Sequence, residues 1–306
     1  MVRNPLLAGL QAAAAAMQFL TRIPIPYQFD YTPRVFRQSV LFYPAVGGVI
    51  GLLLGLFAYA AGHLLPLGPA AVLTLILWVL LTGGLHLDGW MDAADGLMSH
   101  RSPERMLEIM KDSRVGAMGV MAAILLLLAK ASFLYEVLRA GSLGFSDSSG
   151  GVELFGFSTA FGPSLLLLVV IPIWSRWWMV VCMVGWPYAR KESGLGSLFR
   201  EVRGIHAAAS GAMAVLTTFL LTGLYAWITR YPSASSSIGS GTVSVLALAA
   251  ILALTAAFLC FLFGWPAARG ISRKLGGLTG DLYGAMNEGL EALLLLAAVA
   301  ACTWLG

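Results

Sequence analysis

Seven long apolar segments recur along this chain, and they restrict its fold more than any other feature of the sequence. Each is about as long as an α-helix must be to cross the roughly 30 Å hydrocarbon core of a bilayer. Hydrophobic residues make up 58% of the 306 residues, whereas soluble domains are about 45–50% apolar. The sequence therefore predicts an all-α, polytopic membrane bundle that forms a single domain over residues 1–306. The expected spans are 40–62, 67–87, 115–137, 161–184, 207–230, 243–265 and 287–305.

The apolar segment 5–20 is shorter and rich in alanine, so it falls short of a full span. Only Arg3 precedes it, and the TRIPIP sequence that follows contains no small-residue cleavage site of a signal peptide. The prolines in that sequence prevent a single helix from continuing into the first span. We therefore expect an N-terminal helix that lies at the membrane interface.

Basic residues are divided unevenly between the two sides of these spans. Fifteen lie before span one or after spans two, four and six, whereas the other loops contain only Arg139 and Arg230. Because cytoplasmic loops carry an excess of Lys and Arg, this pattern places the N-terminus and those three loops in the cytoplasm and the C-terminus outside. Topology also explains the net charge of +4 better than nucleic-acid binding does, since the cations are scattered over membrane loops.

A charged stretch between Leu85 and Gly119 differs sharply from the apolar spans. It holds ten charged residues, in a chain of which only 11% is charged. Asp88, Asp92 and Asp95 are spaced i, i+4, i+7, so one helix would place the three carboxylates on one face, within an arc of about 60°. Like charges this close need a cation between them, and hard oxygen ligands suit Mg²⁺ or Mn²⁺. The sequence therefore predicts a carboxylate-bound metal ion at a membrane surface.

Cations follow the aspartates where the chain turns back toward the membrane. Ser102 and Pro103 predict the start of a short amphipathic helix that ends near Ser113. Lys111 and Arg114 then lie at the expected depth of the aspartates, on the opposite side of the turn. A phosphate held between a metal ion and these two cations fits this arrangement.

Two later loops on the same expected side also combine glycine with charge. One is YARKESGLG, which contains Arg190, and the other is RKLGGLTGDLYGAMNE, which contains Gly277. Glycine-rich turns can present backbone N–H groups to phosphate, although both loops could equally be ordinary turns between helices. Together with the aspartate stretch they could close over one site. The second loop could add further oxygen ligands there, from Asp281, Asn287 and Glu288.

Two polar residues in or beside the spans need a separate explanation. His86 leaves a straight helix about 160° away from Asp88, so we expect it to be packed or to cap the helix rather than to join the carboxylates. Arg176 lies inside span four, where a charge is costly. A functional role and a structural role, in which neighbouring tryptophans hold it by cation–π contact, are equally consistent with its position. Single cysteines in separate spans suggest neither a disulfide framework nor a zinc site: Cys182, Cys260 and Cys302.

These motifs resemble one known family. LHLDGWMDAADGL and ERMLEIMKDSRVGAMG are similar to the signature of the cobalamin synthase family, the adenosylcobinamide-GDP ribazoletransferases. FLTRIPIP, YPAVGGVIGLLLG, YARKESGLG and GGLTGDLYGAMNE resemble further blocks of that family in the same order, so the resemblance covers most of the chain. The largest departure is YARKESGLG, where the family usually has YAREGGLG.

The resemblance implies a Mg²⁺-dependent, multi-pass enzyme of the cell inner membrane with cytoplasmic catalytic loops. It would join adenosylcobinamide-GDP to α-ribazole or α-ribazole 5′-phosphate and release GMP, a late step of cobalamin biosynthesis. Further partners would be the lipid bilayer and, as alternatives left open, other enzymes of nucleotide-loop assembly or a second copy of this chain.

On this interpretation a ribose hydroxyl attacks the phosphorus bonded to the cobinamide arm, and GMP leaves in line. Asp88, Asp92 and Asp95 would hold the metal ion, and either Asp95 or Asp281 would accept the hydroxyl proton. The phosphate oxygens would be bound by Lys111, Arg114, Arg190 and the loop around Gly277.

Two other functional classes are compatible with the charge pattern. A lipid-diphosphate transferase also holds Mg²⁺ on aspartates, but this chain lacks the longer DGxxAR pattern of CDP-alcohol phosphotransferases and the second DxxxD block of prenyltransferases. A transporter or channel would place its acids at the bilayer midplane and show an internal repeat. Here the aspartates gather at one face and no repeat is visible, so we rank both classes lower.

Overall fold

The computed structural model describes residues 5–26, 32–143, 153–154, 157–158, 163–190, 199, 201–230 and 238–305. Helices make up nearly all of this part, accompanied by two short antiparallel strands, β1 (Glu153–Leu154) and β2 (Phe157–Ser158). A 3-10 turn, η1 (Val40–Phe42), leads into α3, and a π-helical turn, η3 (Cys260–Gly264), joins α10 to α11. The helices are α1 (Pro5–Leu20), α2 (Pro33–Ser39), α3 (Tyr43–Leu64), α4 (Leu67–Thr82), α5 (Leu85–Leu97), α6 (Pro103–Ile109), α7 (Ala117–Leu143), α8 (Pro163–Gly185), α9 (Gly204–Arg230), α10 (Ile238–Leu259), α11 (Trp265–Leu275) and α12 (Gly280–Leu305).

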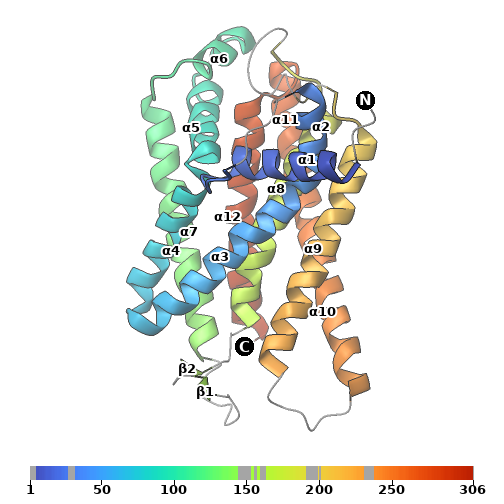
Figure 1. Cartoon of the computed structure of the whole chain (residues 1–306). Helices are drawn as coiled ribbons and strands as arrows, with labels where there is room; N and C mark the ends of the chain where they lie inside the picture. Colours follow the sequence, from blue (N-terminus) through green and yellow to red (C-terminus); the bar gives the residue numbers. More distant parts are fainter. Residues whose placement is uncertain are drawn as a thin grey trace.

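Six helices of the described part are long and apolar enough to cross a membrane, and the bent pair α4–α5 makes seven if it counts as one span. Most of the long helices stand roughly upright in Figure 1, whereas α3 crosses them obliquely, and the N-terminus lies near one end of the bundle and the C-terminus near the other. α1 lies across them, as an interfacial helix would (Figure 1). The predicted all-α membrane bundle is confirmed. The Gly- and Ser-rich segments 141–162 and 233–241, which their composition predicts to be flexible loops outside the membrane, lie largely outside the described residues, as do residues 191–198.

Glycines let α3 and α8 pack closely. Gly47 and Gly51 lie one turn apart on α3 and face the backbone of α8 at Pro172 and Val169, so a Cβ at either glycine would overlap main-chain atoms. Small residues at this spacing are typical of closely packed membrane helices. α8 also packs against α9 and α12, which makes it the central helix of the bundle.

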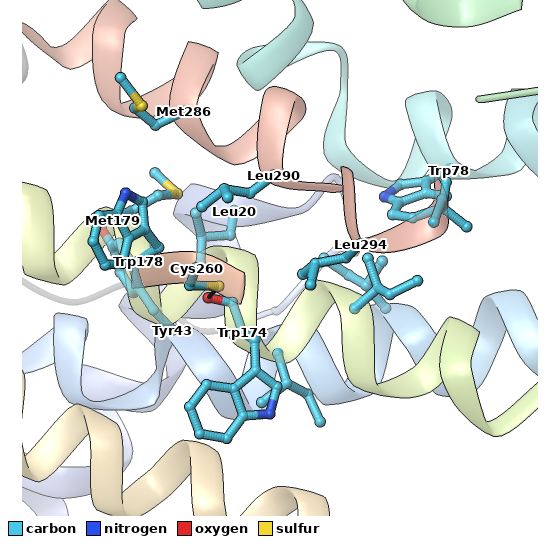
Figure 2. Close-up of a cluster of buried hydrophobic side chains, with 14 of the residues drawn as sticks. Leu20, Tyr43, Trp78, Trp174, Trp178, Met179, Cys260, Met286, Leu290 and Leu294 are labelled. Atoms are coloured by element: carbon cyan, nitrogen blue, oxygen red, sulfur yellow. Dashed lines mark hydrogen bonds between the residues drawn. The ribbon is translucent and has the colours of Figure 1, made fainter. Parts of the chain in front are cut away.

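The hydrophobic core surrounds α8. Figure 2 shows Trp174 and Trp178 of α8 near Cys260 of η3 and Leu290 of α12. The Cys260 thiol donates to the Trp174 carbonyl oxygen at 3.7 Å. Interlocked aromatic and aliphatic side chains therefore hold the long helices in one fixed arrangement.

Two glycines bend the chain sharply just before the aspartates. The axes of α4, which ends at Thr82, and α5, which begins at Leu85, differ by 90°. Gly83 and Gly84 have φ angles of 62° and 70°, a left-handed conformation that residues with a Cβ rarely adopt. The expected span 67–87 is therefore not one continuous helix, because these glycines end one helix and start another in a new direction.

Candidate functional site

One cavity gathers charged side chains from segments that lie far apart in the sequence. Its volume is about 410 Å³. α5 contributes Asp88 and Asp92, the segment after α6 contributes Lys111, and the residues around Arg190 and Asp281 close the other side. The structure thus brings together residues from all three of the glycine- and charge-rich loops.

Close packing of α5 on α12 directs Asp88 and Asp92 toward this cavity. The buried stripe of α5 includes Gly89, where a Cβ would lie only 2.5 Å from the Asp281 carbonyl oxygen. This close approach brings the carboxylates of α5 to the first turn of α12, which carries Asp281. The glycine in the DGW sequence is therefore explained by helix packing.

Asp95 is engaged elsewhere, which corrects the predicted cluster of three aspartates. Its carboxylate accepts hydrogen bonds from Gly116 N at 2.7 Å and from Gly119 N at 2.8 Å, at the start of α7. The first N–H groups of a helix lack intrahelical partners and favour an anion. Asp95 therefore anchors α7 to α5, while Asp88 and Asp92 line the cavity.

Arg190 and Asp281 form an ion pair at the cavity, with Arg190 Nη2 donating to Asp281 Oδ2 at 2.7 Å. A short backbone contact holds their loops together. Leu278 N donates to Pro187 O, and Ala189 N donates to Leu278 O, each at 2.8 Å. The pair is therefore built from two loops that meet only in the folded chain.

Gly277 lies at this loop contact, with a φ angle of 157°. A Cβ at this position would overlap the carbonyl group of Pro187 and lie 2.8 Å from Ala189 N. The missing side chain of Gly277 lets the two loops approach, and its phosphate-binding role stays a prediction. Gly280 and Gly284 are the glycines of this segment that line the cavity.

Lys111 and Arg114 point to different surroundings. Lys111 lines the cavity together with Asp112 and Ser113, whereas the Arg114 side chain is 87% exposed. Arg114 donates to Asp112 through Nη2 at 2.6 Å and through Nε at 3.0 Å. These hydrogen bonds lower the pKa of Asp112 to about 2, so Asp112 is ionised at neutral pH. The prediction that both cations flank one phosphate is not met in this geometry, because Arg114 pairs with its near neighbour.

Apolar side chains line another part of the cavity. Phe19 of α1, Met179 and Met183 of α8, and Phe199 contribute to this wall. The rings of Phe19 and Phe199 lie edge to face with centroids 5.7 Å apart. A few charged groups beside an apolar wall are typical of pockets that bind small molecules or cofactors.

The carboxylates of the cavity fit a Mg²⁺ ion that is shared with a phosphate ligand. Within the described ranges, no three Asp, Glu, His or Cys side chains form a complete metal site by themselves. Mg²⁺ usually keeps several waters and is held by one or two carboxylates together with substrate phosphates. Asp88 and Asp92 supply this number of carboxylates at one wall.

A second charged cluster, which we call the buried network, lies inside the bundle. Lys130 of α7 donates to Glu288 at 2.5 Å and to Glu291 at 2.6 Å, both on α12. Arg176 of α8 donates to Glu291 at 2.7 Å. Arg176 is thus held by a carboxylate and not, as the structural interpretation expected, by neighbouring tryptophans. The cation that lies over a tryptophan ring is Lys130, whose Nζ is 4.8 Å from the centroid of Trp78.

Asn287 and Glu288, which we predicted as additional oxygen ligands, make their polar contacts within the buried network. α12 begins at Gly280, so both residues lie about two turns inside the helix rather than at its start. Asn287 Nδ2 lies 3.1 Å from Nδ1 of His86, which is 1% exposed. The prediction that His86 is a packed residue is confirmed, and the ligand role of Asn287 and Glu288 is not supported.

Our sequence reasoning missed Lys130 and Glu291. The signal was present, because an ionisable side chain inside an apolar span is costly and needs a partner. The sequence alone does not say which of the intramembrane charges pair, since Lys130 and Glu291 are 161 residues apart.

The fold defines a polytopic helical membrane protein, and one of its cavities gathers carboxylates and cations from segments that lie far apart in the sequence. Residues 12–299 match the family described as cobalamin-5-phosphate synthase. The chain belongs to this family, which confirms the resemblance found in its motifs.

Similar relatives carry the name adenosylcobinamide-GDP ribazoletransferase. The one from Brevibacillus brevis is 38% identical, with alignment over 95% of this chain and 98% of the relative. The one from Desulfitobacterium hafniense is 40% identical over 92% of this chain and 94% of the relative. The one from Desulforamulus reducens is 37% identical over 90% and 91%, respectively. No solved structure matches the chain.

Proposed function

We propose that this protein is an adenosylcobinamide-GDP ribazoletransferase, the activity for which its relatives are named. It would join the phosphate on the cobinamide arm of adenosylcobinamide-GDP to a ribose hydroxyl of α-ribazole or its 5′-phosphate and release GMP. One observation carries the proposal: Asp88 and Asp92 line the same cavity as Lys111 and Arg190. Metal-binding carboxylates beside cations are the groups that transfer from a diphosphate requires.

Asp88 and Asp92 are the proposed ligands of Mg²⁺, for which Mn²⁺ could substitute. When bound, such an ion neutralises charge on the diphosphate. Arg190 and Lys111 would bind the remaining phosphate oxygens. Arg190 suits this task because its planar guanidinium can bind two oxygens at once.

Asp281 is the group that would accept the proton of the attacking ribose hydroxyl. In the reaction a bond forms between the ribose oxygen and the phosphorus, the bond from that phosphorus to the GMP oxygen breaks, and its electron pair leaves with GMP. Arg190 and Thr279 donate to Asp281 Oδ2, at 2.7 and 3.4 Å. The other oxygen of Asp281, Oδ1, is therefore the one that would accept the hydroxyl proton.

The apolar wall suits the planar base of the nucleoside substrate. Phe19, Met179 and Phe199 offer a surface on which a flat aromatic ring can stack. A base held there would leave its ribose hydroxyls nearer to the charged wall. We place the protein in the inner membrane with these loops in the cytoplasm, on the basis of the distribution of basic residues.

The test is GMP release by purified protein in liposomes. We expect release only when adenosylcobinamide-GDP, α-ribazole 5′-phosphate and Mg²⁺ are all present, and loss of release after chelation. Folded protein that releases no GMP with both substrates would overturn the proposal. Labelled lipid diphosphates tested on the same preparation would then show whether the cavity serves a lipid-diphosphate transferase.

A further inference from the structure

Buried polar contacts connect the cavity to the centre of the bundle. His86 lines the cavity, and its Nδ1 lies 3.1 Å from Asn287 Nδ2. Asn287 Nδ2 also donates to Glu291 Oε1 at 3.1 Å. Glu291 in turn accepts from Lys130 and Arg176. These contacts tie α5 to α7, α8 and α12.

The charges of the buried network are balanced and shielded from water. The side chains of Lys130 and Arg176 face those of Glu288 and Glu291, and each is at most 9% exposed. Buried ion pairs offset their desolvation only in good geometry, and removal of one partner leaves another charge without compensation. The network therefore has few alternative arrangements, and it holds α12 in a fixed position relative to α7 and α8.

His86 extends this fixed position to α5. On the α7 side, α5 is held by Trp90, which donates to the Ala122 carbonyl at 3.1 Å, and by Asp95. On the α12 side, His86 Nδ1 accepts a hydrogen bond from Asn287 Nδ2. Because side chains leave a helix at about 100° intervals, fixing His86 also fixes the directions of the acidic side chains that follow it.

We propose that His86 and Asn287 are positioning residues, through which the buried network sets the orientation of α5 and so the separation of Asp88 and Asp92 from Asp281. The significance of that separation rests on the proposed function, whereas the geometry can be tested without it. In this proposal neither residue makes or breaks a bond of the reaction, and both act through the orientation of α5. Partners that orient metal ligands commonly matter for activity nearly as much as the ligands themselves.

The test compares His86→Leu with His86→Asn. Leucine removes the acceptor, whereas the Oδ1 atom of asparagine can take the place of the histidine Nδ1 and accept from Asn287. Spin labels on Met98→Cys, at the end of α5, and on Leu296→Cys of α12 report the distance between the helices by pulsed electron paramagnetic resonance. Both sites are exposed, at 52% and 46%. The background is Cys302→Ser, because the remaining cysteines are buried.

We expect His86→Leu to shift or broaden the distance distribution and His86→Asn to retain it. In the GMP assay, His86→Leu should lower kcat about 10–100-fold with both KM values nearly unchanged, and His86→Asn should recover most of kcat. Thr218→Val is the matched control. It removes a buried hydrogen bond from Trp174 Nε1, 3.1 Å long, between α8 and α9, and should leave the distance unchanged.

An unchanged distance in folded His86→Leu would overturn the proposal, and so would equal effects of leucine and asparagine. If His86→Leu does not fold, Asn287→Leu breaks the same hydrogen bond from α12 and is measured in the same way. Failure of both variants to fold would assign the pair to folding instead of positioning. If the wild-type protein releases no GMP, the proposed function fails, while the spin-label distances still decide the positioning role.

Discussion

Arg190 and Asp281 are 91 residues apart in the chain, yet their side chains form an ion pair of 2.7 Å at the cavity. The exposed fractions of the two side chains are 13% and 25%, so water screens the pair only in part. The parallel backbone contact between Tyr188 and Leu278 holds both loops in register. The fold thus sets the proposed phosphate-binding cation, Arg190, beside the proposed proton acceptor, Asp281.

Arg190→Gln should weaken use of the diphosphate substrate. The loss of a charged hydrogen bond worth about 1.5–3 kcal/mol corresponds to about a 10–100-fold lower kcat/KM. The kcat/KM of Arg190→Lys should lie between those of the wild type and Arg190→Gln, because lysine keeps the charge but not the paired donors. Steady-state GMP release measures both variants. If Arg190→Gln kept the kcat/KM of the wild type, Arg190 would not bind the phosphate.

Asp88→Asn and Asp92→Asn should each lower Mg²⁺-dependent GMP release by about 100-fold or more, since metal ions stabilise transition-state charge by several kcal/mol. Each variant should also need more Mg²⁺ for half-maximal rate. Glu104→Gln is the matched control, because Glu104 is an exposed acid of α6 outside the cavity. The metal-site proposal fails if either folded aspartate variant keeps the wild-type response to Mg²⁺.

Asp95→Ala should mainly destabilise the fold. The change removes the acceptor of two backbone N–H groups at the start of α7, at Gly116 and Gly119, at a cost of about 2 kcal/mol. We expect a lower thermal midpoint in detergent. Asp95→Asn should recover part of the lost thermal stability, because the amide oxygen still accepts one hydrogen bond. A normal midpoint together with abolished activity would instead return Asp95 to the catalytic machinery.

Lys130→Met should destabilise the protein by about 3–5 kcal/mol, because it leaves Glu288 and Glu291 buried with too little positive charge. The double variant Lys130→Met, Glu288→Gln restores the charge balance and should recover most of that loss. Thermal unfolding of the two single variants, the double variant and the wild type completes a double-mutant cycle. Additive losses would show that Lys130 and Glu288 do not interact.

The apolar segments were sufficient to predict the membrane bundle, because the thickness of the bilayer sets the length of each span. The same local reasoning gave one span over 67–87 and did not place the break at Gly83 and Gly84. Their left-handed φ angles turn α5 by 90° from α4. Glycine permits such a turn without requiring it, so the sequence marks the place of the bend but not its angle.

The sequence by itself determined the fold class, the family and the charged segments that line the cavity, since these depend on composition and on local spacing. Only the tertiary structure decided which residues of those segments meet. It placed Asp88, Asp92, Lys111, Arg190 and Asp281 at one cavity and gave Asp95 and Gly277 to helix and loop contacts. It also paired Lys130 with Glu291 across 161 positions. Such partnerships depend on how helices pack in three dimensions, and the spacing of residues along one helix contains no information about the helix that faces it.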